Sequence, residues 1–200
     1  MKIVLITGPS GSGKSTLADL LSNNLSNALI LRTDNYYKTG LISKLFSKIL
    51  KSYFDKSISL NIKLLEKDIK SILENKKASH IYKYDFIKKK RFKIYKEINK
   101  INYLIIEGIF ALEIIELIEN YNYLLVKIKT NKNLCRKRVL KRDNEERGKN
   151  TIQSFKNFNC AWNNYKLKEK IFKLKKFKNL FVLKTDSDIN KILKIISTNI

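Results

Sequence analysis

The sequence contains little of what divides or cross-links a chain: one proline, six glycines and two cysteines among 200 residues. With no Ser/Gly-rich or Pro-rich tract and no visible repeat, no linker or low-complexity segment is expected. Cys135 and Cys160 lack the spacing of a metal site, and we interpret them as free thiols in a reducing compartment. These features favour a single domain spanning 1–200.

Long hydrophobic runs are also absent. The four apolar residues from Ile3 to Ile6 are too few for the core of a signal peptide. The most apolar later stretch, Leu104 to Ile118, is interrupted by three glutamates, which argues against a membrane span. We therefore expect a cytoplasmic protein with no membrane partner.

Acidic residues are few beside the basic ones, 18 against 42, and the formal net charge is +24. Such an excess is typical of proteins that bind nucleic acid. Only six of the basic residues are arginine, however, and the chain is crowded with Lys, Ile, Asn, Phe and Tyr, the amino acids of A/T-rich codons. Genome composition can produce this charge, so we interpret runs such as 166–178 as solvated faces and expect no specific nucleic-acid partner.

Short apolar segments alternate with helical patterns along the chain. The sequence predicts strands at 2–7, 28–31, 103–106, 124–128 and 180–183, and helices at 14–25, 60–73, 111–119, 132–146 and 189–196. Alternating aromatic residues between 81 and 94 predict a β-hairpin that turns at the lysine cluster 88–90. This order indicates an α/β fold with a five-stranded parallel sheet flanked by helices on both faces, and a small hairpin subdomain at 81–95.

A glycine-rich segment lies between the first strand and the first helix. It reads GPSGSGKS and fits the pattern G-x-x-x-x-G-K-[ST] of a P-loop. In that motif backbone N–H groups and the helix N-terminus hold the β-phosphate, the lysine reaches the β- and γ-oxygens, and the last hydroxyl ligates Mg²⁺. A chance glycine turn would give the lysine and the hydroxyl no role. We therefore expect ATP or GTP to be bound by Gly8, Pro9, Ser10, Gly11, Ser12, Gly13, Lys14, Ser15 and Thr16.

Two carboxylates follow predicted strands at the edge of the sheet where ligands bind in open α/β folds. Asp34, just after the second strand, can accept the proton of an acceptor hydroxyl or share a metal ion, although an isolated Asp there would more often cap a turn. Glu107 ends the strand at 103–106, where a Walker-B-type acid holds Mg²⁺. Ser15, Glu107 and Asp34 form the predicted metal site.

Four of the six arginines lie between residues 136 and 147. Arg138 and Arg142 are four residues apart on one helix face, and Arg147 precedes Gly148, which can end the helix. Arginine binds phosphate oxygens with a planar fork, so its concentration here favours a lid over 132–149 that closes on the transferring phosphoryl group. The alternative is an exposed charged helix.

In combination, these motifs resemble the uridine kinase branch of the phosphoribulokinase/uridine kinase family over residues 3 to 160. The P-loop alone is unspecific, but the ordered set is specific. Its blocks are Gly8 to Thr16, Asp34-Asn35-Tyr36-Tyr37, Phe54-Asp55, Tyr84-Asp85-Phe86 with Arg91, and Glu107-Gly108-Ile109 followed by Arg142-Asp143 and Glu146-Arg147-Gly148.

The resemblance implies ATP- or GTP-dependent phosphorylation of the 5′-hydroxyl of uridine or cytidine, with Mg²⁺, so that the partners are a small-molecule nucleoside and a nucleotide. The resemblance makes Asp34 the catalytic base, with Lys14, Arg142 and Arg147 as its catalytic partners. It also implies that Asp55 binds the ribose hydroxyls. It places the remaining substrate contacts at Tyr37, Phe54, Tyr84, Phe86, Lys89, Arg91 and Lys149, whereas periodicity alone would assign the aromatic residues to the core.

The sequence departs from the family pattern in three places. Lys56-Ser57-Ile58 replaces the usual His-Pro-Asp, Lys89 stands where a base-contacting His is usual, and Lys149 replaces the second Arg of E-R-G-R. The base preference, the choice between ATP and GTP and assembly into a homo-oligomer stay open. So do two alternatives: a related kinase for pantothenate or a sugar phosphate, and a nucleic-acid-binding P-loop NTPase.

Overall fold

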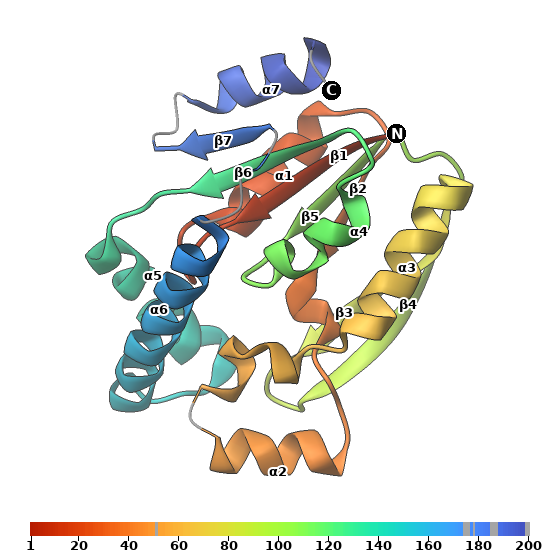
Figure 1. The fold of residues 1–200 in the computed structure, drawn as a ribbon. Coiled ribbons are helices and arrows are strands. Elements are labelled where there is room, and N and C mark those ends of the chain that lie inside the picture. Colours follow the sequence, from red (N-terminus) through yellow and green to blue (C-terminus); the bar gives the residue numbers. More distant parts are fainter. Residues whose placement is uncertain (51, 174–176, 178, 185–187, 199–200) are drawn as a thin grey trace.

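A computed structural model describes the chain except for residues 51, 174–176, 178, 185–187 and 199–200. Its central sheet has five parallel strands in the order β2-β5-β1-β6-β7 (Figure 1). The strands are β1 (Lys2–Thr7), β2 (Ala28–Arg32), β5 (Tyr103–Glu107), β6 (Tyr123–Ile128) and β7 (Leu180–Leu183). This topology confirms the predicted five-stranded parallel sheet. Short runs of Ile, Leu and Val predicted it because they suit strands that are buried on both faces.

Helices cover both faces of this sheet. On one face, Val4 and Ile6 of β1 pack in a cluster with α1 (Lys14–Asn24) and α7 (Asp188–Thr198). On the other, Ile3 and Leu5 pack with α3 (Ile62–Asn75), η4 (Ala111–Ile114) and α4 (Ile115–Ile118). Alternate residues of β1 therefore belong to different cores, and the P-loop that follows β1 is fixed between them.

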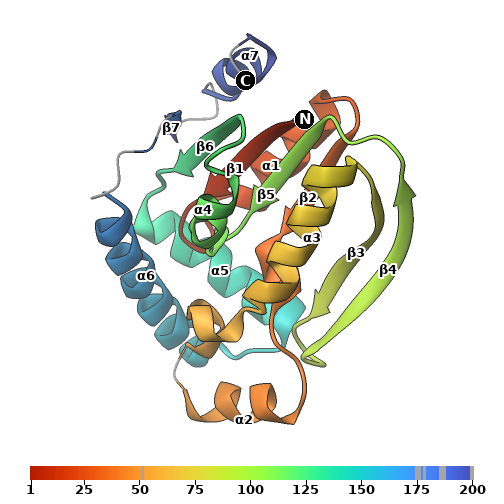
Figure 2. The same ribbon diagram turned by 45° about the vertical axis from the view of Figure 1, so that its right-hand side comes forward.

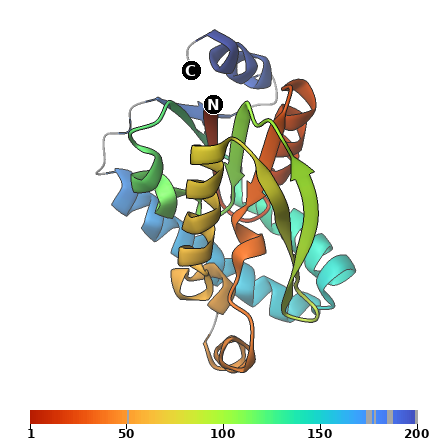
Figure 3. The ribbon, with the colours of Figure 1, turned by 90° about the vertical axis from the view of Figure 1, so that its right-hand side faces the viewer.

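A hairpin of β3 (Ala78–Asp85) and β4 (Lys90–Ile98) forms a separate two-stranded antiparallel ribbon beside α3 (Figures 2 and 3). The predicted hairpin is confirmed, although its strands begin earlier and end later than expected. His80 of β3 has a side chain that is 19% exposed, with its Nε2 3.8 Å from Oδ2 of Asp68 in α3. This contact connects the ribbon to α3.

Two helices were not predicted. α2 (Leu41–Ile49) lies at the end of the molecule away from both termini (Figure 1). α6 (Thr151–Lys173) packs along α5 (Lys132–Arg147), where Phe158 joins Cys135 and Val139 in a small cluster. No helix in the described ranges is long and apolar enough to span a membrane.

The lysine run 166–178 is only partly a solvated face. Lys166 pairs with Glu169 within α6 at 2.8 Å, and Lys168 pairs with Glu113 of η4 at 2.6 Å. The second pair links α6 to the main body of the domain. Residues 174–176 and 178 of this run lie outside the described residues.

Candidate active site

The P-loop joins β1 to α1 and closes tightly against α5. Gly11 has φ +79°, and a Cβ there would lie 2.5 Å from the carbonyl oxygen of Cys135 in α5. Only glycine allows both this backbone conformation and this approach. The Lys14 ammonium is buried and donates a hydrogen bond to the Pro9 carbonyl at 2.9 Å, within the loop itself. Burial lowers the pKa of Lys14, an effect that Glu107 and Asp34 oppose.

The ends of β2 and β5 bring oxygen ligands to the start of α1. Glu107 accepts a hydrogen bond from the Ser15 hydroxyl at 2.9 Å. Burial raises the pKa of Glu107, and Lys14 opposes that rise. Arg32 of β2 also reaches Glu107, with its Nε 3.4 Å from Oε1. A hydroxyl and a carboxylate beside a phosphate-binding loop are the hard oxygen ligands that suit Mg²⁺, so the residues fit that ion.

Asp34 lies in η1 (Thr33–Tyr36), the short helix that follows β2. The hydroxyl of buried Tyr37 donates to the Phe54 carbonyl at 2.7 Å and lies 3.4 Å from Oδ1 of Asp34. Burial, followed by the charges of Asp34 and Asp55, raises the pKa of Tyr37, which keeps this hydroxyl protonated. Tyr37 thus connects the segment of Asp34 to that of Phe54.

Asp55 ends η2 (Tyr53–Asp55), with η3 (Ser57–Ser59) immediately after it. Burial, with a contribution from Asp34, raises the pKa of Asp55 to about 7, although Lys149 and Arg147 oppose the rise. Its carboxyl therefore changes charge near neutral pH. A carboxyl group whose pKa is raised this far is typical of functional sites rather than of surface residues with a structural role.

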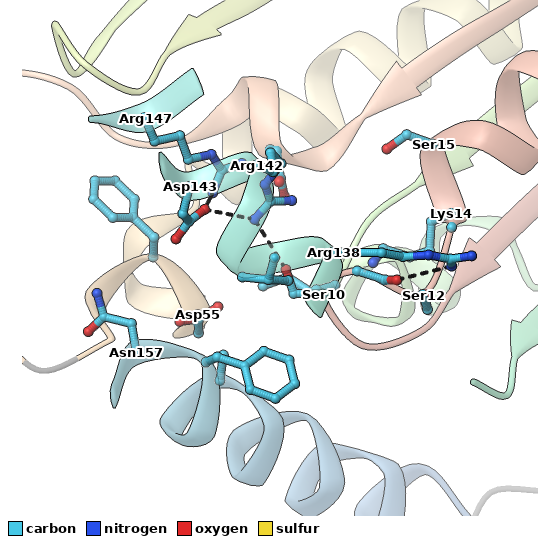
Figure 4. A pocket seen from close by; sticks show the side chains of 18 of the residues that line it. Ser10, Ser12, Lys14, Ser15, Asp55, Arg138, Arg142, Asp143, Arg147 and Asn157 are labelled. Carbon is cyan, nitrogen blue, oxygen red and sulfur yellow. Dashed lines mark hydrogen bonds and ion pairs between the residues drawn. The ribbon is translucent and has the colours of Figure 1, made fainter. Parts of the chain in front are cut away.

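The C-terminal end of α5 supplies a group of cations. Arg142 and Arg147 lie on either side of Asp143, and Asp55 lies across the pocket from them (Figure 4). Gly148 ends the helix with φ +61°, and Lys149 then turns back so that its Nζ lies 2.9 Å from Asp143. The Arg147 guanidinium also lies 3.7 Å from the ring centre of Phe86, which connects α5 to the hairpin.

One cavity of about 1280 Å³ contains both the phosphate loop and the two aspartates. The predicted site residues that line it are Ser10 to Thr16, Asp34, Tyr37, Phe54, Asp55, Phe86, Lys89, Glu107, Arg142, Arg147 and Lys149. Such a volume is sufficient for two small ligands side by side.

Four predicted residues lie outside the cavity wall. Gly8 and Pro9 form the entry to the loop, and the Pro9 carbonyl holds Lys14. Tyr84 is buried with its ring 5.3 Å from that of Tyr37, and Arg91 donates to the Tyr37 carbonyl at 3.1 Å. The last two therefore support a wall residue from behind.

The structure adds residues that sequence reasoning missed. Asp143 stands inside a predicted block but received no role, although the basic residues Arg142, Arg147 and Lys149 nearby in the sequence could have indicated one. Arg32 contacts Glu107 only because β2 and β5 are neighbours. Gln153 and Asn157 of α6 line the cavity, and because α6 was not predicted, no sequence signal placed them there.

Comparisons with known proteins agree with this geometry. The profile of the Phosphoribulokinase / Uridine kinase family matches residues 3–167. A uridine kinase of Borrelia turicatae is 34% identical over 154 residues, which cover 77% of this chain and 72% of that protein. One of Staphylococcus aureus (strain JH9) is 30% identical over 148 residues, 74% of this chain and 70% of that protein. A solved structure of a possible uridine kinase from Bacillus stearothermophilus superposes with a TM-score of 0.59 at 18% identity. The superposition covers 90% of this chain and 88% of that one, and it supports the fold.

Proposed function

Since the chain belongs to the phosphoribulokinase/uridine kinase family of P-loop kinases, we propose that it transfers the γ-phosphoryl group of ATP to the 5′-hydroxyl of uridine or cytidine. The observation that carries the proposal is the position of Asp34 and Asp55, which share one cavity with the P-loop. One carboxylate serves the reacting hydroxyl and the other the ribose. The names of the relatives support this acceptor.

On the donor side, the P-loop amides and Lys14 hold the nucleotide phosphates. Lys14 exchanges its hydrogen bond to Pro9 for phosphate oxygens, which are better partners for a buried ammonium. Ser15 and Glu107 would hold Mg²⁺, assisted by Asp34. When bound, the ion neutralises phosphate charge as the terminal phosphoryl group departs.

On the acceptor side, Asp34 accepts or orients the proton of the attacking hydroxyl, and Asp55 accepts hydrogen bonds from the ribose 2′- and 3′-hydroxyls. Tyr37, Phe54 and Phe86 provide an apolar wall for the pyrimidine ring. Since phosphoryl transfer leaves little covalent chemistry to the protein, catalysis rests on alignment and on charge neutralisation by Arg142 and Arg147.

A panel of acceptors tests the proposal. Uridine, cytidine, pantothenate and a sugar phosphate are each incubated with ATP and Mg²⁺, and ADP release is coupled to a dye reaction. We expect turnover with at least one pyrimidine nucleoside, at a rate well above that of hydrolysis without acceptor. Turnover with pantothenate or the sugar phosphate alone would reject the proposed acceptor.

The assigned role of Asp55 has its own test. A half-buried carboxylate that binds ribose hydroxyls is left with an unmet acceptor when a deoxynucleoside enters, and such a site can reject the analogue strongly. We expect kcat/KM for uridine to exceed that for 2′-deoxyuridine by on the order of a hundredfold or more. Asp55→Ala should reduce this ratio, mainly by lowering the efficiency with uridine. Equal efficiencies in the wild type would reject the assignment.

A further inference from the structure

Asp143 has the densest set of charged partners of any carboxylate in the described part of the chain. Its side chain is 3% exposed. Oδ1 lies 3.2 Å from Nη2 of Arg142 and 3.5 Å from Nη1 of Arg147, and Oδ2 lies 2.9 Å from Nζ of Lys149. Lys149, followed by Arg142 and Arg147, holds the pKa of Asp143 below its usual range despite its burial. Asp143 is therefore ionised whenever the cations are charged.

The same residue sets the path of the chain that carries these cations. The backbone carbonyl of Asp143 accepts hydrogen bonds from the backbone N–H groups of Gly148 and of Lys149, the latter at 3.1 Å. These bonds end α5 and return Lys149 toward the helix. The backbone carbonyl of Asp143 thus fixes the position of the Lys149 backbone, and the carboxylate of Asp143 fixes the position of the Lys149 ammonium group.

The cations would not hold this arrangement by themselves. Burial lowers the pKa of Arg147, and the charge of Arg142 lowers it further, because the two guanidinium groups repel each other. Asp34 and Asp55 lie in the same cavity and attract the cations, since Asp34 raises the pKa of Arg147 and Lys149 opposes the raised pKa of Asp55. Asp143 therefore competes with these two aspartates for the same cations.

Asp143 leaves donors available for a ligand. An arginine has five N–H donors, and Asp143 is contacted by one nitrogen from each guanidinium. Nη2 of Arg142 also lies 3.5 Å from the Ser10 hydroxyl of the P-loop, and its Nε is buried without a hydrogen-bond partner among the described residues. The nitrogen of Arg142 that contacts Asp143 therefore also lies beside the loop that holds phosphates (Figure 4).

We propose that Asp143 is a positioning residue for phosphoryl transfer: it holds Arg142, Arg147 and Lys149 in their reactive arrangement before a nucleotide binds, and it keeps them away from Asp34 and Asp55. This inference rests on the proposed function. It differs from a merely structural role because it requires the cations to lose their positions when Asp143 loses its charge, while the protein stays folded.

The test compares Asp143→Asn with Glu145→Gln. Both remove one negative charge from α5, but Glu145 is exposed and pairs only loosely with Lys141 at 4.0 Å. With the best nucleoside acceptor, we expect Asp143→Asn to lower kcat by about 10- to 100-fold, the range that a misplaced group produces. The Kd for Mg·ATP, measured by calorimetry without acceptor, should stay within about threefold of the wild type, because the P-loop contacts are retained. Asp143→Glu should restore part of kcat, and Glu145→Gln should match the wild type.

A second readout needs neither acceptor nor turnover. Phenylglyoxal modifies accessible guanidinium groups, and mass spectrometry reports the rate at each arginine. In Asp143→Asn, Arg142 and Arg147 should react severalfold faster than in the wild type, whereas Arg136 on the same helix should react at an unchanged rate. If the wild type phosphorylates no nucleoside, the proposed function fails, and this labelling still decides the role of Asp143.

Three outcomes would overturn the inference. The first is unchanged kcat and unchanged labelling in Asp143→Asn. The second is an equal loss of kcat and of Mg·ATP affinity, which would indicate general damage to the nucleotide site. The third is the loss of a cooperative thermal transition in both Asp143→Asn and Asp143→Glu, which would make Asp143 a folding residue.

Discussion

Asp55 should lower the stability of the empty enzyme at neutral pH. Its carboxyl has a pKa of about 7 in the folded protein against an ordinary value of 3.8, a difference of about three pH units. Each unit corresponds to 1.36 kcal/mol, so ionisation of Asp55 costs the folded state at most about 4 kcal/mol. Because Asp55 faces an open cavity, solvent screening reduces this value.

The sign of the pH dependence follows from proton binding. Below pH 4 the carboxyl is protonated in both the folded and the unfolded protein, and the cost is absent. Between pH 4 and 7 the folded state retains a proton that the unfolded state has lost, so the stability of the wild type falls as pH rises. Above pH 7 the full cost is present. Asp55→Asn stays neutral throughout and avoids it.

The measurement is thermal unfolding of wild type and Asp55→Asn between pH 4 and 8, followed by circular dichroism. We expect equal Tm values near pH 4 and a Tm for Asp55→Asn that is up to about 10 °C higher at pH 8, since 1 kcal/mol shifts Tm by about 2–4 °C at this size. Glu74→Gln, which removes an exposed carboxylate of α3, is the matched control and should follow the wild type. A Tm difference between wild type and Asp55→Asn that is the same at pH 4 and pH 8 would refute the reasoning.

Three further predictions concern the remaining site and the charge of the protein. Lys14→Ala should stay folded but lose turnover by on the order of a hundredfold or more, as is typical when one charged stabiliser is removed, and near-wild-type turnover would contradict a phosphate-binding loop. Asp34→Asn should abolish phosphorylation while the Kd for ATP, measured by calorimetry, changes little; equal losses in both would mark Asp34 as a structural or purely metal-binding residue. Binding to random DNA, measured by fluorescence anisotropy, should be weak and disappear near physiological salt because it would rest on phosphate contacts alone, and submicromolar salt-resistant binding would favour the nucleic-acid alternative.

The parts of the fold that the sequence predicted are those with local signals. The strand, P-loop and helix from Lys2 to Asn24 form a contiguous unit in which glycine positions, apolar run and helix start all indicate the same structure. The strands β1, β5 and β6 were recognisable for a similar reason, because runs buried on both faces are almost continuously apolar.

The missed elements have weak local signals. α6 is rich in Lys and Asn, and its packing depends on a few positions such as Phe158, which meets α5 only in the folded chain. α2 is short, and no acidic residue occupies its first turn. For both helices, tertiary contacts rather than propensity decide the structure.

Within the site, sequence patterns located residues but not their partners. The P-loop and Asp34 could be placed because each follows a strand, and Glu107 because it ends one. The contact between Arg32 and Glu107, and the three cations around Asp143, depend on strand order and on the helix end at Gly148. The contact between Arg32 and Glu107 joins two strands that lie far apart in the sequence, and it has no signal in a single sequence.

The central claim is transfer of the γ-phosphoryl group to a nucleoside, and isotope transfer measures it most directly. ATP carrying ¹⁸O in its γ-phosphoryl oxygens is incubated with the enzyme, Mg²⁺ and a mixture of uridine and cytidine, and the products are analysed by mass spectrometry with fragmentation. The labelled phosphoryl group should appear intact on the 5′-oxygen of UMP or CMP. Label found only in inorganic phosphate, with both nucleosides unchanged, would contradict this claim.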